Sequence, residues 1–277
     1  MELRIGTSGF SFPDWKGKVY PSDIKKQDML PYYEKELGFD SLEVNFTYYT
    51  IPTIASIRGM VNKTSRNFEF VVRSHKDMTH EIWKDRERKI IKDTGEVLKK
   101  FVYGIRPMID EGRLGCVLLQ FPSFFWPNRQ SHDYIISCKE RMGNIPTVVE
   151  FRNRAWVRDS TWSFLKDNNL GFCVVDEPPL PRLMPLVPQV TSEISYVRLH
   201  GRNMNWFNAS REERYDYLYS EEELKRLLPE IEKLHQGVRK GYIMFNNCHA
   251  GSAVSNARQL KRMMGITEKV ELKLFDI

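Results

Sequence analysis

The sequence predicts an α/β fold in which eight parallel strands close into a (β/α)8 barrel, as a single domain that spans residues 1–277. Eight short, strongly apolar segments alternate mostly with helical patterns, which is typical of a parallel sheet. The count of eight favours a closed barrel over an open sheet. No GxGxxG motif follows the first strand, which disfavours a dinucleotide-binding sheet. With 277 residues, of which 41% are hydrophobic, the chain can fill a large core.

Each predicted strand is a mostly apolar run that ends in polar residues. The runs cover residues 3–8, 41–45, 68–75, 116–122, 147–152, 172–177, 194–200 and 242–247. Because side chains alternate along a strand, Val148, Glu150 and Arg152 share one face of the fifth run. A carboxylate and a guanidinium therefore lie on one wall at the C-terminal end of a buried strand, and this design recurs along the chain.

Helical patterns separate most of the strands. We expect helices over residues 32–37, 53–61, 83–109, 133–141, 161–166, 220–235 and 252–264. The longest is expected because Val97, Leu98 and Phe101 belong to one apolar stripe of an amphipathic helix. A Ser-Glu-Glu-Glu capping signature opens the helix from Ser220. Each of these helices would cover the outside of the barrel.

Two segments lack a helical pattern. Residues 178–190 contain five prolines and are expected to form a stiff surface loop, because a strand resumes directly after them. The tail, residues 266–277, alternates only weakly and receives no assignment.

Charge and cysteine content narrow the class of protein. The net charge of +6 and a pI near 9.0 favour anionic partners, although a basic enzyme without such a partner is the alternative. The four cysteines contain no CxxC pair, so we expect reduced core thiols in a cytoplasmic protein and no zinc cluster: Cys116, Cys138, Cys173 and Cys248. No apolar run approaches the roughly 18 residues of a membrane span, and no targeting segment is visible.

Polar residues gather at the ends of the predicted strands, where the active site of such a barrel lies. The catalytic candidates are carboxylates and a histidine: Glu43, Glu150, Asp176 and His200. The ligand-binding candidates carry guanidinium, amide or indole groups: Asn45, Arg73, Gln120, Arg152, Arg198, Arg202, Trp206 and Asn246. Charged side chains are seldom buried without partners, so this many at one end need a reason.

Two interpretations account for these charges. In the first, the arginines bind an anion while the carboxylates perform acid–base work. In the second, an internal ion-pair network joins three carboxylates to three guanidiniums: Glu43, Glu150 and Asp176 with Arg73, Arg152 and Arg198. Such networks are costly and do not reliably stabilise a protein, so the anion site is the leading interpretation.

A divalent metal is an open alternative that the sequence does not favour, and no other cofactor is indicated. Glu150, Asp176 and His200 could supply a mixed oxygen and nitrogen ligand set, with His75 nearby. However, no HExxH or paired-histidine motif is present. A retaining glycosidase would need two carboxylates about 5 Å apart, and a serine hydrolase would need a nucleophile elbow, which is missing.

The segment 201–219 is rich in aromatic and arginine residues. Arg202 and Trp206 have the composition of a surface that stacks nucleic-acid bases, to which Trp126 and the pair Tyr48-Tyr49 could add. Packing of a long loop onto the barrel rim explains the aromatic residues equally well. His80 and His249 are expected to be ordinary surface histidines.

With these residues in place, the chain resembles the YecE-like family (DUF72), a domain of unknown function. The motifs that carry the resemblance run nearly end to end: Ile5-Gly6-Thr7-Ser8-Gly9, Glu43-Val44-Asn45, Thr79-His80, Gln120-Phe121-Pro122, Val149-Glu150-Phe151-Arg152, Val197-Arg198-Leu199-His200-Gly201-Arg202 and Phe245-Asn246-Asn247. The resemblance implies a TIM-barrel fold and no agreed activity. Phe10, Arg73 and Asn153 depart from the residues usual in the family, and Arg73 puts a lysine-base role at that position in doubt.

The leading functional hypothesis is a barrel that binds phosphate-bearing ligands at the C-terminal strand ends. DNA or RNA is the candidate partner, and phosphodiester hydrolysis is the candidate reaction, by fold analogy with endonuclease IV. The alternatives are a metal-independent lyase, isomerase or glycosidase that acts on a small polar substrate, and a non-catalytic binding module. The sequence assigns neither a substrate nor an oligomeric state.

Overall fold

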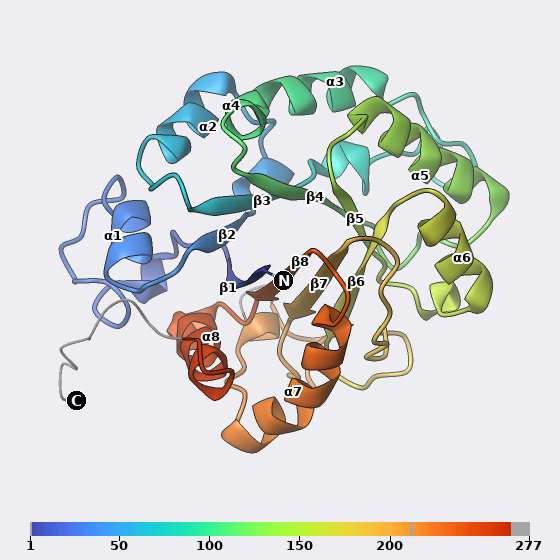
Figure 1. The fold of residues 1–277 in the computed structure, drawn as a ribbon. Helices are drawn as coiled ribbons and strands as arrows, with labels where there is room; N and C mark the ends of the chain where they lie inside the picture. The colour runs from blue at the N-terminus through green and yellow to red at the C-terminus, as the bar shows by residue number, and fades with distance from the viewer. Residues whose placement is uncertain (1, 211–212, 267–277) are drawn as a thin grey trace.

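Eight parallel strands form a closed barrel in which each strand pairs with its neighbour in sequence and β8 pairs with β1 (Figure 1). The computed structural model describes residues 2–210 and 213–266. The strands are β1 (Glu2–Ser8), β2 (Ser41–Val44), β3 (Glu69–Arg73), β4 (Leu114–Gln120), β5 (Thr147–Glu150), β6 (Gly171–Asp176), β7 (Ile194–Leu199) and β8 (Lys240–Phe245). The predicted fold class is confirmed, and all eight predicted runs contain a strand.

Helices surround the barrel on its outer side (Figure 1). They are α1 (Met29–Lys35), α2 (Ile54–Val61), α3 (Gly95–Gly104), α4 (Arg106–Asp110), α5 (Arg129–Met142), α6 (Asp159–Asp167), α7 (Glu221–His235) and α8 (Ser252–Met263). Short 3-10 turns are η1 (Pro13–Trp15), η2 (Phe46–Tyr48), η3 (Lys76–Met78), η4 (Arg154–Trp156), η5 (Glu213–Tyr215) and η6 (His249–Gly251). The Ser220 and Glu223 side chains form the capping box expected at the start of α7. No helix lies between β6 and β7, as the prolines predicted.

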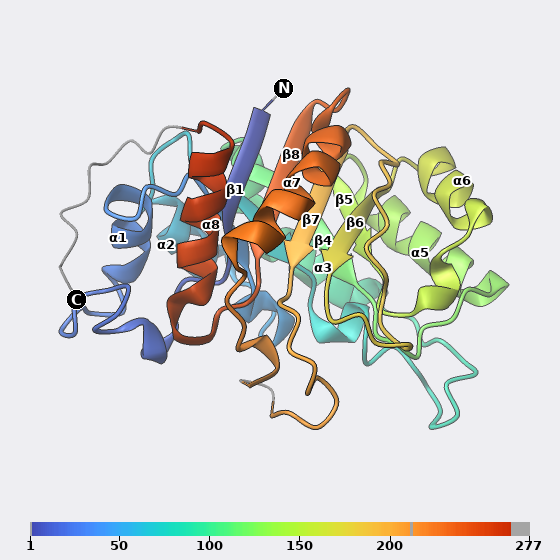
Figure 2. The same ribbon diagram turned by 90° about the horizontal axis from the view of Figure 1, so that it is seen from below.

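The single long helix predicted over residues 83–109 is wrong. Residues 83–94 form no helix; Trp83 and Ile91 pair there as an isolated antiparallel bridge. The carboxylate of Asp85 accepts the backbone N–H groups of Lys89 and Ile90, so a local turn competes with helix formation. Figure 2 shows this segment projecting from the same end of the barrel as the loop after β7.

The rest of the predicted long helix is divided in two. α3 ends at Gly104, and α4 then begins with Arg106 and Pro107. A proline has no backbone N–H and clashes with the preceding turn, so it belongs at the start of a helix and interrupts a longer one. Gly104 also lies against Pro52, because a Cβ atom at Gly104 would be 2.0 Å from the carbonyl oxygen of Pro52. The apolar stripe that we predicted is therefore carried by α3 and α4 as separate helices.

The two faces of β5 show how the barrel separates its core from its polar centre. On the outer face, Phe151 stacks on Trp156 with ring centroids 4.1 Å apart, and Trp156 in turn stacks on Phe125. On the inner face, Glu150 lies beside Gln120 in the register of β4 and β5. The alternation predicted from the sequence is thus realised, and it directs Glu150 into the barrel.

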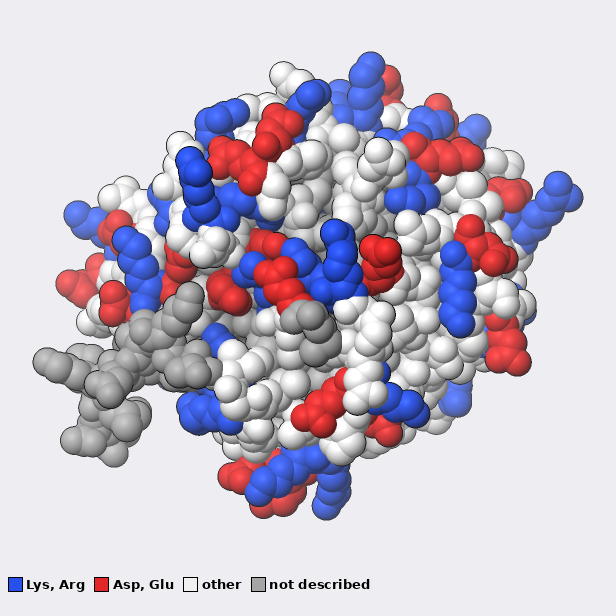
Figure 3. Space-filling view, viewed as in Figure 1, with Lys and Arg blue, Asp and Glu red and all other residues white. Residues whose placement is uncertain are grey.

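The end of the barrel at which the strands begin carries its own ion-pair cluster. Glu69, at the start of β3, accepts a hydrogen bond from the Tyr242 hydroxyl (2.5 Å) and pairs with Arg4 (3.3 Å) and Lys240 (2.5 Å). Figure 3 shows positive and negative side chains mingled near the centre of the face on which the N-terminus lies. The charges at this end therefore neutralise one another.

The four cysteines are free and buried, as expected for core thiols. Among residues 2–210 and 213–266, no helix is both long enough and apolar enough to cross a membrane.

Candidate functional site at the C-terminal end of the barrel

Arg198, on β7, is the centre of a buried polar network at the end where the strands finish. Its Nη1 donates to Glu150 Oε2 (2.6 Å) and to Gln120 Oε1 (3.1 Å). Its Nη2 donates to Glu43 Oε1 (2.7 Å), and the second oxygen of Glu43 accepts the Tyr196 hydroxyl (2.6 Å). Only 1% of Arg198 is exposed. Strands β2, β4, β5 and β7 therefore meet at one guanidinium that carboxylates already neutralise.

Arg152 extends this network towards the surface. Its Nε lies 2.5 Å from Glu150 Oε1, and its Nη1 donates to Glu177 Oε2 at 2.5 Å. Glu177 also accepts the backbone N–H of Met184 (2.7 Å), which ties the proline-rich segment to the network. Glu177 was not among the predicted site residues, because the strand pattern placed Asp176 at the end of the sixth run. Arg152 is therefore paired with two buried carboxylates.

His200 is neutral and serves as an acceptor for Arg152. The Nη2 of Arg152 lies 3.0 Å from His200 Nε2, and an arginine can only donate, so Nε2 must carry a lone pair. Burial, followed by the charge of Arg152, lowers the pKa of His200 to about 3. The ring proton then lies on Nδ1. The structure places Asn246 Nδ2 2.9 Å from this atom, so the amide accepts the proton only when it is turned to bring its oxygen towards the ring.

The charge state of Glu150 follows from its partners. Burial alone would raise the pKa of this carboxyl, but Arg152 and Arg198 outweigh burial and hold the pKa well below its usual range. Glu150 is therefore an anion between two guanidiniums and has no exposed surface. Part of the internal ion-pair network that the sequence offered as its second interpretation is therefore present, without Asp176 and Arg73.

Asp176 lies in a separate cluster. Its carboxylate accepts hydrogen bonds from Arg202 Nη2 (2.7 Å) and from the Tyr219 hydroxyl (2.6 Å). The predicted metal-ligand set of Glu150, Asp176 and His200 does not come together, although His200 Nε2 lies 3.4 Å from Glu150 Oε1. Within the described ranges, no group of three His, Cys, Asp or Glu residues is arranged to hold a metal ion. Arg202, a predicted ligand-binding residue, forms an ion pair with Asp176 in this cluster.

Arg73, at the end of β3, differs from the other central arginines. Its guanidinium lies 3.9 Å from the centroid of the Tyr48 ring. Among residues 2–210 and 213–266, no carboxylate oxygen lies within 4.0 Å of its nitrogen atoms. Burial, and next the charge of Arg198, lower the pKa of Arg73. Arg73 is thus a guanidinium without a close counter-ion.

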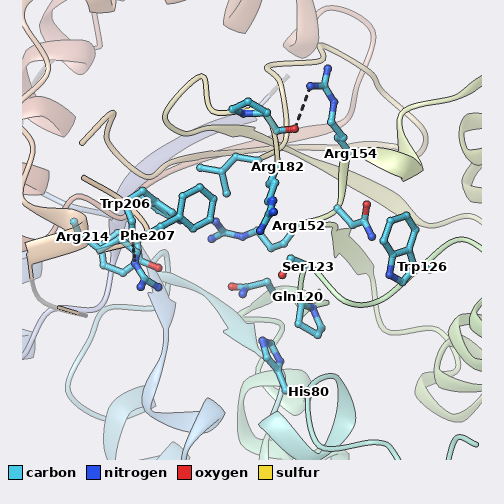
Figure 4. A pocket seen from close by; sticks show the side chains of 15 residues that line it. His80, Gln120, Ser123, Trp126, Arg152, Arg154, Arg182, Trp206, Phe207 and Arg214 are labelled. Carbon is cyan, nitrogen blue, oxygen red and sulfur yellow. Dashed lines mark hydrogen bonds between the residues drawn. The ribbon is translucent and has the colours of Figure 1, made fainter. Parts of the chain in front are cut away.

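A cavity of about 720 Å³ opens above the buried network (Figure 4). Its lining comes from the loops that follow β3 to β7: His80, Gln120, Pro122, Ser123, Trp126, Arg152, Asn153, Arg154, Pro181, Arg182, Leu183, Trp206, Phe207, Arg214 and Tyr215. Four of these residues are arginines, and none is an aspartate or glutamate. The positive charge of the described wall therefore comes from the other three arginines, because Arg152 is already paired with Glu150 and Glu177.

Three of the predicted site residues reach the cavity, namely Gln120, Arg152 and Trp206. The candidate acid–base residues Glu43, Glu150 and His200 lie beneath it and have no exposed surface. Asn45 and Asn246 are half-buried at the ends of β2 and β8 and do not line the cavity. Strand alternation thus located the buried network under the cavity better than it located the cavity wall.

The open stacking face expected at Trp206 is not present. Trp206 is 5% exposed, its ring packs edge-on against Tyr215 (5.5 Å), and the Arg214 guanidinium lies 5.6 Å from its centroid. The alternative of loop packing is therefore correct for this residue. Phe207, which is 56% exposed, and Trp126, which is 59% exposed, carry the open aromatic surface.

Several residues of the cavity wall were not predicted from the sequence. His80 was expected to be an ordinary surface histidine but lines the cavity, and burial, followed by Arg73 and Arg152, lowers its pKa to about 4. Arg154 opens the short 3-10 turn η4 and Arg182 lies in the loop after β6, and neither segment has a periodic pattern. The only available signal was Thr79-His80, which belongs to the motifs of the family resemblance.

Comparison with known proteins gives consistent matches along the chain. A family model described as "Protein of unknown function DUF72" matches residues 4–274. The UPF0759 protein YunF of Bacillus subtilis (strain 168) is 30% identical over 276 residues, which cover 95% of this chain and 95% of that protein. A crystal structure of a DUF72 family protein from Thermotoga maritima is 44% identical, with a TM-score of 0.88 over 96% of this chain and 100% of that chain.

A more distant likeness concerns the fold alone. The 3-keto-D-glucoside 4-epimerase YcjR from E. coli is 11% identical, with a TM-score of 0.54 over 95% of this chain and 100% of that chain. At this identity the likeness shows a shared barrel architecture and transfers no residue roles.

Proposed function

Because the chain belongs to the DUF72 family, whose function is unknown, we propose from the geometry of its site that it binds a phosphate-bearing ligand in the cavity at the C-terminal end of the barrel. The observation that supports this proposal is the composition of the cavity wall, which holds four arginines and no described carboxylate. A surface of one charge sign, set in a hollow with low-dielectric walls, attracts ions of the opposite sign. An anionic ligand is therefore favoured over a neutral or cationic one.

Three of the four arginines are available to a ligand. Arg154 and Arg182 are exposed, Arg214 is half-buried, and none of them has a carboxylate within 4.0 Å among the described residues. Among the described residues, the side chains of Arg154 and Arg214 donate to backbone carbonyl groups, those of Pro181 and Trp206. A planar guanidinium can hold two oxygens of a phosphate at once, which favours phosphate over a single-point anion.

The size and the aromatic content of the cavity support a nucleotide unit of DNA or RNA as the ligand. A volume of about 720 Å³ lies within the range of small-ligand pockets, about 300–1,000 Å³. Phe207 and Trp126 present exposed rings on which bases can stack, in the manner of proteins that bind single strands without sequence preference. Phosphate contacts would position such a strand without selecting its sequence.

Binding ranks ahead of phosphodiester hydrolysis. Glu150 and His200, the best acid–base candidates, have no exposed surface and lie under Arg152 and Gln120. A general base must come within hydrogen-bond reach of its substrate, directly or through one water molecule. The same burial separates these groups from a small polar substrate, so we do not advance the isomerase alternative on a likeness of 11%.

A binding titration tests the proposal. The probe is a fluorescein-labelled single-stranded decanucleotide with a 5′-phosphate, and the readout is anisotropy over a series of salt concentrations. The double variant Arg154→Ala/Arg182→Ala should bind at least about tenfold more weakly, since ~1.4 kcal/mol corresponds to a factor of ten. Its plot of log K against log salt should be less steep by about 0.7 units for each single-strand phosphate group that the variant no longer neutralises.

The matched control is Arg239→Ala, which removes an exposed arginine beside the start of β8, at the opposite end of the barrel. This variant should bind as the wild type does. Phe207→Ala should weaken binding by about 1–3 kcal/mol if one base stacks on that ring. Equal affinity of the double variant and the wild type, or no binding at low salt, would remove a phosphate-bearing ligand from consideration.

A further inference from the structure

Arg73 occupies an unusual electrostatic position. Arg152 and Arg198 each contact two buried carboxylates, whereas Arg73 has no carboxylate within 4.0 Å in the described part of the chain. Its Nε is buried and has no hydrogen-bond partner among the described atoms. Within the described residues its guanidinium lies 3.9 Å from the centroid of the Tyr48 ring, and an aromatic face is a weaker partner than an anion.

Arg73 lies behind one wall of the cavity. The ring that it faces, Tyr48, packs edge-on against His80 with centroids 5.0 Å apart, and His80 lines the cavity. Figure 4 shows His80 on the opposite side of the cavity from Arg154 and Arg182. The unpaired guanidinium and these two exposed arginines therefore flank the cavity from two sides.

Arg73 is half-buried, and a guanidinium that loses part of its hydration without gaining a counter-ion is energetically unfavourable. Glu43 and Glu150, the carboxylates that act on Arg73 at longer range, are committed to Arg198. Asn45 follows the registered pair Val44 and Val72, so it lies beside Arg73, and its Oδ1 is also buried without a partner. Two residues that follow neighbouring strands, Asn45 after β2 and Arg73 at the end of β3, thus each carry a buried polar atom without a described partner.

We infer a second anion subsite at Arg73, so that the ligand carries two phosphate groups, one held at Arg73 and the other by Arg154 and Arg182. This inference rests on the proposed function and narrows the ligand class to bisphosphorylated compounds, of which two phosphates of a nucleic-acid strand are one case. A hydroxyl group next to the inner phosphate would satisfy the Asn45 oxygen. The two phosphate groups of the ligand would then lie on opposite sides of the cavity, which His80 and Arg152 line.

Calorimetric titration with two nucleotides tests this subsite. The probes are adenosine 5′-monophosphate and adenosine 3′,5′-bisphosphate, measured at one salt concentration and one pH. The wild type should bind the bisphosphate at least tenfold more tightly than the monophosphate. In Arg73→Gln this ratio should fall to within about twofold, whereas Arg239→Gln should preserve it. Arg73→Lys, which keeps the charge, should retain most of the ratio and guards against a trivial loss of folding.

The outcomes separate this subsite from the proposed function. A bisphosphate advantage that persists in Arg73→Gln, or equal binding of both nucleotides by the wild type, overturns the second subsite. If Arg154→Ala/Arg182→Ala still weakens the monophosphate in that case, phosphate binding in the cavity stands. If neither nucleotide nor the decanucleotide binds to the wild type, the subsite and the proposed function both fail.

Discussion

Replacing Glu150 by glutamine tests whether the buried network holds the barrel together. Glu150→Gln keeps the shape of the side chain but removes the charge that Arg198 contacts at 2.6 Å and Arg152 at 2.5 Å. All of Glu150 and nearly all of Arg198 are buried, so water cannot replace the missing partner. The variant should therefore fold into a less stable protein.

The size of the effect follows from the burial of the pair. Removing one partner of a buried ion pair typically costs about 3–5 kcal/mol, because the remaining charge is left uncompensated. At about 2–4 °C for each kcal/mol in a chain of this size class, the thermal midpoint should fall by about 6–20 °C. A glutamine retains some hydrogen bonding, which favours the lower half of that range.

The pH dependence has a definite sign. The folded pKa of Glu150 lies well below the value of about 4.3 expected in the unfolded chain, so its contribution to stability is complete above that value. This contribution is lost as the pH falls below about 4.3 and through the folded pKa. Glu150→Gln has no such group, so the difference in midpoint between the two proteins should shrink on acidification.

Calorimetry or circular dichroism at pH 7 and below pH 4.3 measures both effects. The control is Glu140→Gln, an exposed position on α5, which should change stability by no more than about 0.5 kcal/mol. An unchanged midpoint at pH 7 would refute the structural role of Glu150. So would a difference between the proteins that grows as the solution is acidified.

Three further predictions concern the surroundings of the network. His200, with a pKa of about 3, should show no imidazole titration by NMR between pH 8 and pH 5, and a midpoint near 6.5 would contradict its neutral acceptor role. Tyr219→Phe removes a hydrogen bond to Asp176 and should destabilise the protein by about 1–3 kcal/mol in denaturant titrations, whereas an unchanged midpoint would show that Arg202 alone suffices. The four buried cysteines should not react with Ellman's reagent until the protein unfolds, and a thiol that reacts rapidly in the native state would show that its site opens.

The strand-end residues could be predicted because two simple regularities act together. Alternation fixes which face of a strand a residue occupies, and a closed parallel barrel brings all C-terminal strand ends to one place. These rules are sufficient to bring Glu43, Glu150 and Arg198 together from three different strands. Neither rule depends on side-chain length or hydration, so both can be applied to the sequence without knowledge of any contact.

The pairing of those residues could not be predicted, because it depends on geometry that the pattern lacks. Asp176 was expected to help neutralise the central arginines, yet Arg202 and the Tyr219 hydroxyl bind it away from the centre. Glu177 took the place at Arg152 although it lies one position beyond the strand. Glu177 therefore pairs with a central arginine where the sequence offered Asp176, because the chain leaves the strand geometry between these two carboxylates.

The cavity wall was least accessible to prediction for a related reason. Arg154 lies in a single 3-10 turn, and Arg182 and His80 lie in loop turns, where neither a period of two nor one of 3.6 assigns a direction to a side chain. Loops take their conformation from local hydrogen bonds and from the scaffold beneath them. A sequence pattern can therefore identify the base of such a site more readily than its rim.

A charged residue at a strand end is therefore not by itself evidence of a ligand-binding site. A guanidinium such as Arg198, which already contacts two carboxylates and is 1% exposed, cannot take a ligand without breaking the network that fixes its position. We therefore propose that a ligand binds to guanidiniums that have no described carboxylate partner, such as Arg73 beside the cavity and the exposed Arg154 and Arg182. Arg152 joins the two regions, because it lines the cavity and also holds Glu150 and Glu177. We therefore expect a ligand phosphate to contact Arg154 and Arg182. Arg152 and Arg198 would stay in their ion pairs beneath it.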